Sequence, residues 1–132
     1  SLSVSTWYPA LVKPFLAPPG WFIGVVWTIL YLLMGITLFL VLTADLNLPA
    51  ARMGIALFAL QLGLNVLWSL VFFGLRSPAL GMAGILLLWG AIAATLREFL
   101  KVSRPAGYLF VPYILWVSFA AVLNFWILLL NP

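Results

Sequence analysis

The chain has 132 residues, of which 67% are hydrophobic and only 6% are charged. A soluble domain carries about 25% charged residues, so this composition excludes an ordinary soluble fold and predicts a surface that faces lipid. The absence of Cys and His excludes disulfides and the commonest metal ligands, and we expect no metal site and no required cofactor. A net charge of +4 from six basic residues is too weak for a nucleic-acid surface.

Residues 1–20 form a proline-rich segment that is apolar enough to contact a membrane. Its four prolines exclude a continuous spanning helix; they are Pro9, Pro14, Pro18 and Pro19. We therefore expect a lid or interfacial loop here. Trp7 and Tyr8 suit the aromatic belt at the membrane surface, and Lys13 can reach the lipid headgroups.

Four apolar runs that carry no formal charge follow, each long enough to cross the hydrocarbon core as a helix. They cover residues 21–43, 53–75, 79–96 and 106–130. Backbone groups in lipid must be satisfied within their own segment, which requires helices, and the short loops require antiparallel neighbours. The predicted fold is an all-α integral membrane protein, a single antiparallel transmembrane helix bundle spanning residues 1–132.

The basic residues are divided unequally between the two sides of the membrane. One side holds Arg52, Arg97, Lys101 and Arg104, whereas the amino-terminal segment and the 76–78 turn contribute only two basic residues to the other. The positive-inside rule therefore predicts that the loops around 44–52 and 97–105 are cytoplasmic.

Three polar residues form a stripe on one face of the second span. Gln61, Asn65 and Ser69 follow each other at intervals of four residues, with Trp68 beside them. Polar groups are costly in lipid, so this stripe should point inward. Two interpretations remain: hydrogen bonds between helices, worth about 0.6 to 2 kcal/mol each, or the polar part of a ligand site.

Several aromatic residues lie too deep for the membrane surface. Trp27, Trp68 and Trp116 are well inside their spans, and Tyr31 follows Trp27 by one helical turn. A buried indole N–H needs an acceptor. Indoles that face amides would line a largely apolar pocket suited to a flat aromatic ligand.

Small residues mark a second face of the same span. Ala59 and Gly63 form a small-xxx-small pair displaced from the polar stripe. This pair allows close approach by a helix of a second copy, or by a neighbouring span of the same chain.

Missing groups exclude two kinds of membrane protein. No span contains an acidic residue, which disfavours a proton-coupled exporter. Haem carriers use His, Cys or Met axial ligands, and the three Met residues here do not pair. Any bound tetrapyrrole would be held by stacking and hydrogen bonds.

Three sequence blocks together resemble the translocator protein family, also called tryptophan-rich sensory proteins or peripheral-type benzodiazepine receptors. The blocks are WYPALVKPFLAPPGWFIGVVWTILYLLMG (residues 7–35), LNVLWSLVFFG (64–74) and PYILWVSFAAVLN (112–124). The resemblance implies a five-helix membrane bundle, often a homodimer, in a prokaryotic cell membrane for this chain. It also implies a pocket beneath the loop before span 21–43 that binds porphyrins and synthetic aromatic ligands.

The resemblance also implies site residues. Matched position by position, the family pocket comprises Trp7, Tyr8, Trp27, Asn65, Trp116 and Ala120; Tyr31 and Trp68 join it by their spacing. In some bacterial relatives, residues that match Trp27 and Trp116 are associated with light- and oxygen-dependent porphyrin breakdown. These two are therefore the candidates for catalysis if the chain performs any.

The sequence departs from the family pattern in three places. The family's first helix should precede Trp7, where only SLSVS stands, and we expect truncation or processing rather than a four-span variant. The family's KPxW element reads Lys13-Pro14-Phe15-Leu16 here, so Leu16 stands where the family pattern has Trp. The proposed cholesterol motif is incomplete, since no basic residue follows Phe125, so specific cholesterol binding is not expected.

The sequence thus favours a membrane receptor or carrier for porphyrins and similar flat hydrophobic ligands, acting in sensing or transport. One alternative is Trp-dependent photo-oxidative degradation of the bound porphyrin. Another is a structural role in assembling other membrane proteins, without any ligand.

Overall fold

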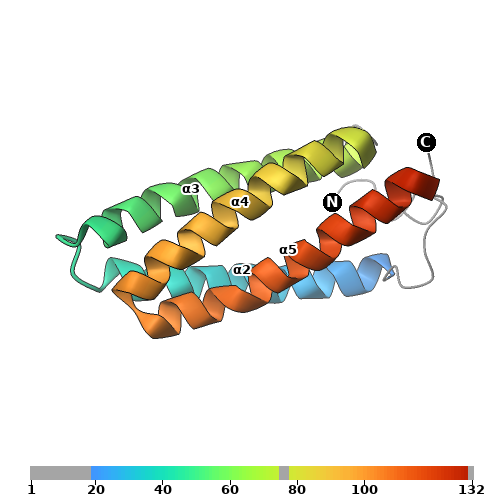
Figure 1. Cartoon of the computed structure of the whole chain (residues 1–132). Helices are drawn as coiled ribbons and strands as arrows, with labels where there is room; N and C mark the ends of the chain where they lie inside the picture. The colour runs from blue at the N-terminus through green and yellow to red at the C-terminus, as the bar shows by residue number, and fades with distance from the viewer. Residues whose placement is uncertain (1–18, 75–77, 131–132) are drawn as a thin grey trace.

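The computed structural model describes residues 19–74 and 78–130, and its architecture is a bundle of long helices (Figure 1). The helices are α2 (Gly20–Leu42), α3 (Pro49–Ser69), α4 (Pro78–Val102) and α5 (Arg104–Leu130), and α3 continues into a π-helical turn, η1 (Leu70–Gly74). All four are long and apolar enough to cross a membrane. The predicted fold, an all-α antiparallel transmembrane bundle, is confirmed.

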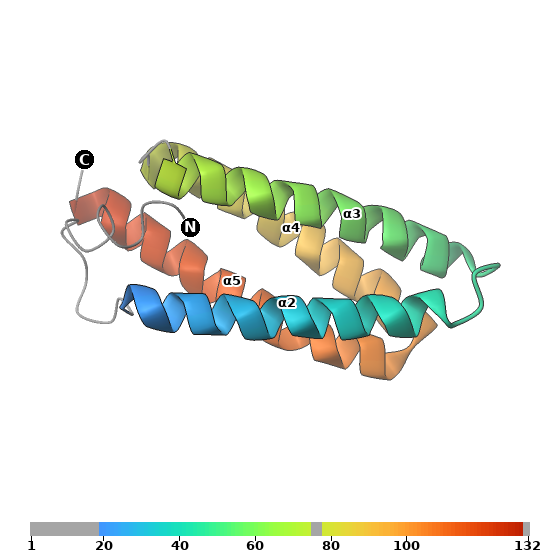
Figure 2. The same cartoon turned by 180° about the vertical axis from the view of Figure 1, so that it is seen from behind.

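The helices pack in the order α3, α4, α5, α2. Figures 1 and 2 show α3 beside α4 and α2 beside α5, and α4 also packs along α5. Helix α2 contacts α3 at only a few points. Helix α2 is therefore held mainly by α5, whereas α3, α4 and α5 form the tightly packed part of the bundle.

Helix α4 extends beyond the apolar run predicted at residues 79–96. It continues to Val102 and carries Arg97 and Lys101, whose charged ends can extend toward the headgroups while the backbone stays helical. Lys101 Nζ also lies 3.3 Å from Glu98 Oε1. Only Ser103 separates α4 from α5, and its Oγ accepts a hydrogen bond from the Ala106 backbone N–H at 3.4 Å, as an N-cap does.

The basic residues in the described part of the chain gather at one end of the bundle. The α2–α3 loop and the α4–α5 connection lie together at the left of Figure 1, opposite the start of α2 and the end of α5. Arg52 is in the first turn of α3, Arg97 and Lys101 are near the end of α4, and Arg104 begins α5. The uneven charge distribution expected from the sequence is thus present in the fold.

An aromatic column fills the core near this basic end. The rings of Phe58, Phe99 and Phe110 lie with centroids 5.5 to 6.2 Å apart, and Tyr113 continues the column at 5.2 Å from Phe110. Glycine allows this close packing: a Cβ at Gly54 would lie 2.8 Å from the Phe99 ring. The column connects α3, α4 and α5 and leads from the basic end to the middle of the bundle.

Candidate functional site

Four polar side chains from three helices form a hydrogen-bonded chain in the middle of the bundle. Tyr31 of α2 donates its hydroxyl hydrogen to Asn65 Oδ1 at 2.8 Å, and Asn65 Nδ2 donates to the Tyr113 hydroxyl at 2.7 Å. The Tyr113 hydroxyl in turn donates to Gln61 Oε1 at 2.7 Å. We call these four residues the polar network; it joins α2, α3 and α5.

The polar network is shielded from the surroundings at its centre and open at one end. Gln61 is 0% exposed, Asn65 2% and Tyr113 1%, whereas Tyr31 is 44% exposed. The inward orientation predicted for Gln61 and Asn65 is confirmed. Because the two residues are one turn apart on α3, they point together toward Tyr113.

One donor of the polar network is unused within the described part of the chain. The Gln61 side-chain nitrogen, Nε2, is buried and has no hydrogen-bond partner among residues 19–74 and 78–130. An unsatisfied buried donor costs about 1–3 kcal/mol. The network can therefore accept one further hydrogen-bond acceptor without losing a bond that it already makes.

Aromatic rings surround the polar network. The Trp27 ring centroid lies 5.8 Å from that of Tyr31, 6.1 Å from that of Trp68 and 6.2 Å from that of Tyr113. These distances are typical of stacked and edge-to-face ring pairs. The structure thus brings together four of the predicted ligand-binding residues, Trp27, Tyr31, Asn65 and Trp68.

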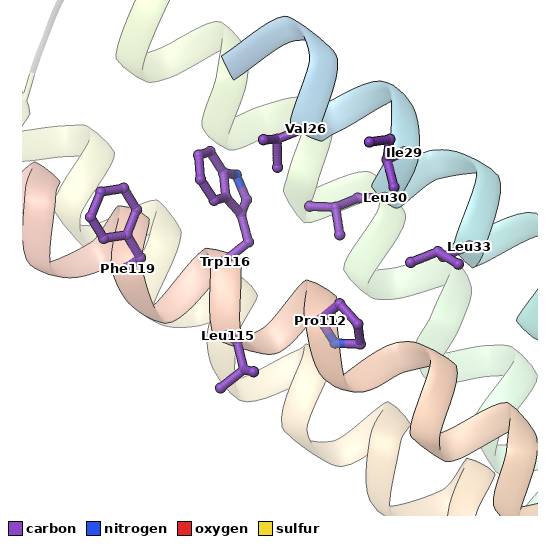
Figure 3. A pocket seen from close by; sticks show the side chains of 8 residues that line it. All are labelled: Val26, Ile29, Leu30, Leu33, Pro112, Leu115, Trp116 and Phe119. Atoms are coloured by element: carbon purple, nitrogen blue, oxygen red, sulfur yellow. The ribbon is translucent and has the colours of Figure 1, made fainter. Parts of the chain in front are cut away.

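Trp116 lies in different surroundings. Its ring neighbours are Phe119 at 5.4 Å and Phe22 of α2 at 6.4 Å, and it lines a groove between α2 and α5 (Figure 3). Trp116 follows Tyr113 by three residues, which turns it by about 60° around α5 from the face that Tyr113 presents. The three deep indoles that the sequence places in one pocket thus divide into a Trp27–Trp68 pair and a separate Trp116.

The remaining predicted site residues are distributed over other parts of the chain. Ala120 is buried, on the same face of α5 as Tyr113. Ala59 and Gly63 are exposed on α3, with no atom within 4 Å of where a Gly63 Cβ would stand. Trp7 and Tyr8 lie outside the described residues.

Sequence reasoning did not include Tyr113 and Gln61 among the ligand-binding residues. Gln61 could have been included, because it precedes Asn65 by one turn on the same predicted face. The importance of Tyr113 follows from its position opposite α3, which spacing within α5 does not reveal. No group of three His, Cys, Asp or Glu in the described ranges could hold a metal ion. The indoles, phenols and amides that the structure brings together offer stacking and hydrogen bonding.

Comparison with known proteins shows similarity over nearly the whole chain. The model of the TspO/MBR family matches residues 1–130. The chain is 49% identical to "Tryptophan-rich protein TspO" of Chlorobaculum tepidum, over 97% of this chain and 81% of that protein. It is 38% identical to "Tryptophan-rich sensory protein" of Cereibacter sphaeroides, over 98% of this chain and 80% of that protein.

The similarity extends to animal proteins. The chain is 38% identical to the human "Translocator protein", over 90% of this chain and 71% of that protein. The prokaryotic relatives and the four candidate spans agree with the expected location, a prokaryotic membrane crossed several times by the chain.

Proposed function

Because the chain belongs to the TspO/MBR family, we propose that it binds porphyrins and similar flat hydrophobic molecules inside the helix bundle. In this proposal the rings of Trp27 and Trp68 stack on the ligand and Asn65 supplies a directed polar contact. Two relatives are named a sensory protein and a translocator protein. For this chain we accordingly propose that binding serves sensing or transport.

The observation that carries the proposal is the polar network beneath the Trp27–Trp68 pair. A membrane interior disfavours buried amides and phenols, and here the buried Gln61, Asn65 and Tyr113 meet the half-exposed Tyr31 among aromatic rings. Within the described ranges, the Gln61 Nε2 donor is unused. A largely apolar site with a few fixed polar groups is the usual composition of a small-molecule site. A porphyrin offers both a large flat face for the rings and carboxylate or pyrrole nitrogen acceptors for the amide.

Titration with protoporphyrin IX tests this proposal. In nanodiscs and in the dark, tryptophan fluorescence of the wild type should fall saturably as porphyrin is added. Asn65→Leu and Trp27→Phe should each weaken binding by about tenfold, equivalent to about 1.4 kcal/mol. The matched control is Trp89→Phe, because Trp89 lies on the exposed side of α4, where its indole N–H bonds Ser118 Oγ at 2.8 Å; its affinity should stay within twofold.

Two outcomes of the titration distinguish binding in a specific pocket from partitioning into lipid. Unsaturable partitioning that is identical in all four proteins contradicts the proposed pocket, whereas selective loss in the Asn65 and Trp27 variants supports it. Trp27→Phe keeps an aromatic ring, so its result also stands if Asn65→Leu fails to fold. Repeating the titration under illumination in air tests the degradation alternative, which requires porphyrin absorbance to decay faster with wild type than with a Trp27→Phe, Trp116→Phe double variant.

We also propose that the protein forms a homodimer through the exposed small residues of α3. Ala59 and Gly63 lie on one outward face, and the open space beside Gly63 lets a second helix approach closely. Gly63→Leu should shift the protein to monomer in detergent, as measured by analytical ultracentrifugation. Gly35→Leu is the control, because Gly35 is also exposed with open space beside it but lies on α2; an equal effect of both changes would contradict the α3 interface.

A further inference from the structure

Helices α4 and α5 together form one outer surface of the bundle. Figure 1 shows these two helices in front of α2 and α3, and Figure 2 shows the reverse. On α4, four exposed residues lie within about 60° of one another around the helix axis; they are Leu86, Gly90, Arg97 and Lys101. The opposite side of α4 is packed into the core, where Ile92 and Phe99 are 0% exposed. The exposed face of α4 therefore points outward, toward lipid.

This face of α4 changes from apolar to basic at the edge of the hydrocarbon core. Residues 78–96 carry no charge, and at 1.5 Å per residue they cover about 28 Å, close to the core thickness of about 30 Å. Arg97 follows directly, where the headgroups begin. Leu86 lies about 16 Å from Arg97 along the helix, which is the depth of about one leaflet. A molecule held at Arg97 therefore has one leaflet of exposed apolar surface beside it.

A similar arrangement occurs on α5. Arg104 begins this helix on the side opposite the buried Tyr113, and the exposed Tyr108 and Leu115 continue its face. Helix α4 packs along α5, and only Ser103 separates the two in the chain. The two basic positions therefore lie at the same end of adjacent helices, each above an exposed face that becomes apolar with depth.

Two guanidinium groups on this surface lack a counter-charge. Arg97 and Arg104 are exposed, and their side chains make neither a hydrogen bond nor an ion pair within residues 19–74 and 78–130. The only two acidic residues of the sequence both lie at this end of the bundle. Glu98 pairs with Lys101 at 3.3 Å, and Asp45 belongs to the α2–α3 loop. Four basic residues thus face two carboxylates, and positive charge remains uncompensated on α4 and α5.

We propose that this surface, the α4–α5 basic surface (Leu86, Gly90, Arg97, Lys101, Arg104, Tyr108 and Leu115), binds an anionic phospholipid. Arg97 and Arg104 bind the headgroup phosphate, and the acyl chains lie along the apolar residues below. Guanidinium groups form strong, charge-assisted hydrogen bonds with phosphate. A zwitterionic lipid brings its own cation and leaves the excess positive charge uncompensated. A soluble anion leaves the apolar part of the surface unused.

The proposed site differs from the general attraction of a basic end to an anionic leaflet. General attraction acts on every basic residue near the headgroups, including Arg52 of α3. The Arg52 side chain already has an acceptor, because its Nη2 donates to the Asn47 backbone oxygen at 3.3 Å. Arg52 is therefore a matched control, with the same charge at the same end of the bundle but on a different helix.

This proposal does not rest on porphyrin binding or on the homodimer. Trp27 and Asn65 belong to α2 and α3, and the small residues Ala59 and Gly63 belong to α3. None of these four residues is part of the α4–α5 basic surface. Lipid binding can therefore succeed or fail separately from the other two proposals.

Competition between two lipids with identical acyl chains tests the proposal. The full chain in detergent is titrated with an equimolar mixture of phosphatidylglycerol and phosphatidylcholine, and native mass spectrometry compares the amounts of the two one-lipid complexes. We expect the wild type to prefer phosphatidylglycerol about fivefold. This ratio is equivalent to about 1 kcal/mol, the typical contribution of a basic residue near an anionic membrane surface.

The variants assign the preference to particular arginines. Arg97→Gln and Arg104→Gln should each lower the preference about twofold, and the double variant should remove it. Arg97→Lys keeps the charge and should retain the preference, as should Arg52→Gln. Circular dichroism checks that each variant is folded, which we expect because the substituted side chains at positions 97 and 104 are exposed and have no partner within the described ranges.

Three results would overturn the proposal. Equal losses in Arg97→Gln and Arg52→Gln would show that only general attraction acts. A preference that survives the Arg97→Gln, Arg104→Gln double variant would place the lipid elsewhere. Complete displacement of phosphatidylglycerol by excess glycerol phosphate or hexaglutamate, which carry negative charge without acyl chains, would show that the surface binds soluble anions instead of a lipid.

Discussion

Tyr113 is the central residue of the polar network. Its hydroxyl accepts a hydrogen bond from Asn65 and donates one to Gln61, while its ring packs against Phe110 and Trp27. Tyr31 makes a single bond at the exposed end of the network. The two tyrosines therefore differ in how many buried groups depend on them.

Removing the two hydroxyl groups should have unequal effects on stability. Tyr113→Phe keeps the ring but leaves Asn65 Nδ2 and Gln61 Oε1 buried without their partner, and we expect a loss of about 1–3 kcal/mol in the free energy of unfolding. Tyr31→Phe removes one part-buried bond and should cost about 0.6 kcal/mol. Unfolding in detergent, followed by circular dichroism, measures both. Equal losses would show that the hydroxyl of Tyr113 is not the centre of the network.

For single residues, the sequence predicts on which face of its helix a side chain lies better than it predicts which residues of other helices that side chain contacts. The four-residue interval between Gln61 and Asn65 correctly placed both side chains inside the bundle. The same kind of spacing grouped Trp116 with Trp27 and Trp68, but Trp116 faces the α2–α5 groove. Periodicity fixes the direction of a side chain around its own helix, and the rotation of that helix against its neighbours is set by packing between helices.

Helix α4 is the element on which the tight part of the bundle depends. It packs along both α3 and α5, and small residues on those two helices allow the approach. A Cβ at Gly54 of α3 would lie 2.8 Å from the Phe99 ring, and one at Gly107 of α5 would overlap Leu100. Phe99 and Leu100, near the carboxyl end of α4, therefore leave no room for a side chain at Gly54 of α3 or at Gly107 of α5.

Adding one methyl group at these positions should destabilise the bundle. Gly54→Ala and Gly107→Ala should each lower the free energy of unfolding by about 1–3 kcal/mol, because the buried Phe99 ring and the Leu100 side chain must move. Gly90→Ala is the control, since no neighbouring atom lies within 4 Å of the place that a Cβ at Gly90 would take. This control should be neutral or stabilising by up to about 1 kcal/mol, because alanine favours the helix. The prediction is wrong if Gly107→Ala and Gly90→Ala have the same unfolding midpoint.

The ends of the elements were harder to predict than their existence. All four spans are present, but α4 extends six residues beyond residue 96 and α3 begins at Pro49 rather than at residue 53. Apolar runs mark where a helix meets hydrocarbon. The helix itself continues into the interface, where Arg97 and Lys101 are solvated and proline at the first position suits the start of α3.

At the scale of the whole molecule, the charged end predicts an orientation in the membrane. Arg52, Arg97, Lys101 and Arg104 lie at the end formed by the α2–α3 loop and the α4–α5 connection. The positive-inside rule assigns this end to the cytoplasm. The family and the fold class were both predictable from the sequence, because three blocks occur in a fixed order between residues 7 and 124 and the apolar runs leave only helices.

Lysine labelling tests the orientation directly. The sequence has only two lysines, Lys13 and Lys101, so Lys13→Arg leaves one lysine without changing the charge. The Lys101 side chain is 50% exposed. A membrane-impermeant amine reagent should modify Lys101 in inside-out vesicles and spare it in right-side-out vesicles, as read by peptide mass spectrometry. The opposite pattern would place the basic end outside.

The single residue between α4 and α5 has a consequence for how the protein is made. Because only Ser103 connects α4 and α5, the end of one helix and the start of the other cannot move far apart during synthesis. We therefore expect the two helices to enter the bilayer together, as one hairpin. Helices α2 and α3 are joined by the longer stretch 43–48, and α2 packs mainly on α5. We therefore expect α2 to dock after the α4–α5 hairpin has formed and to be the first helix to separate from the bundle.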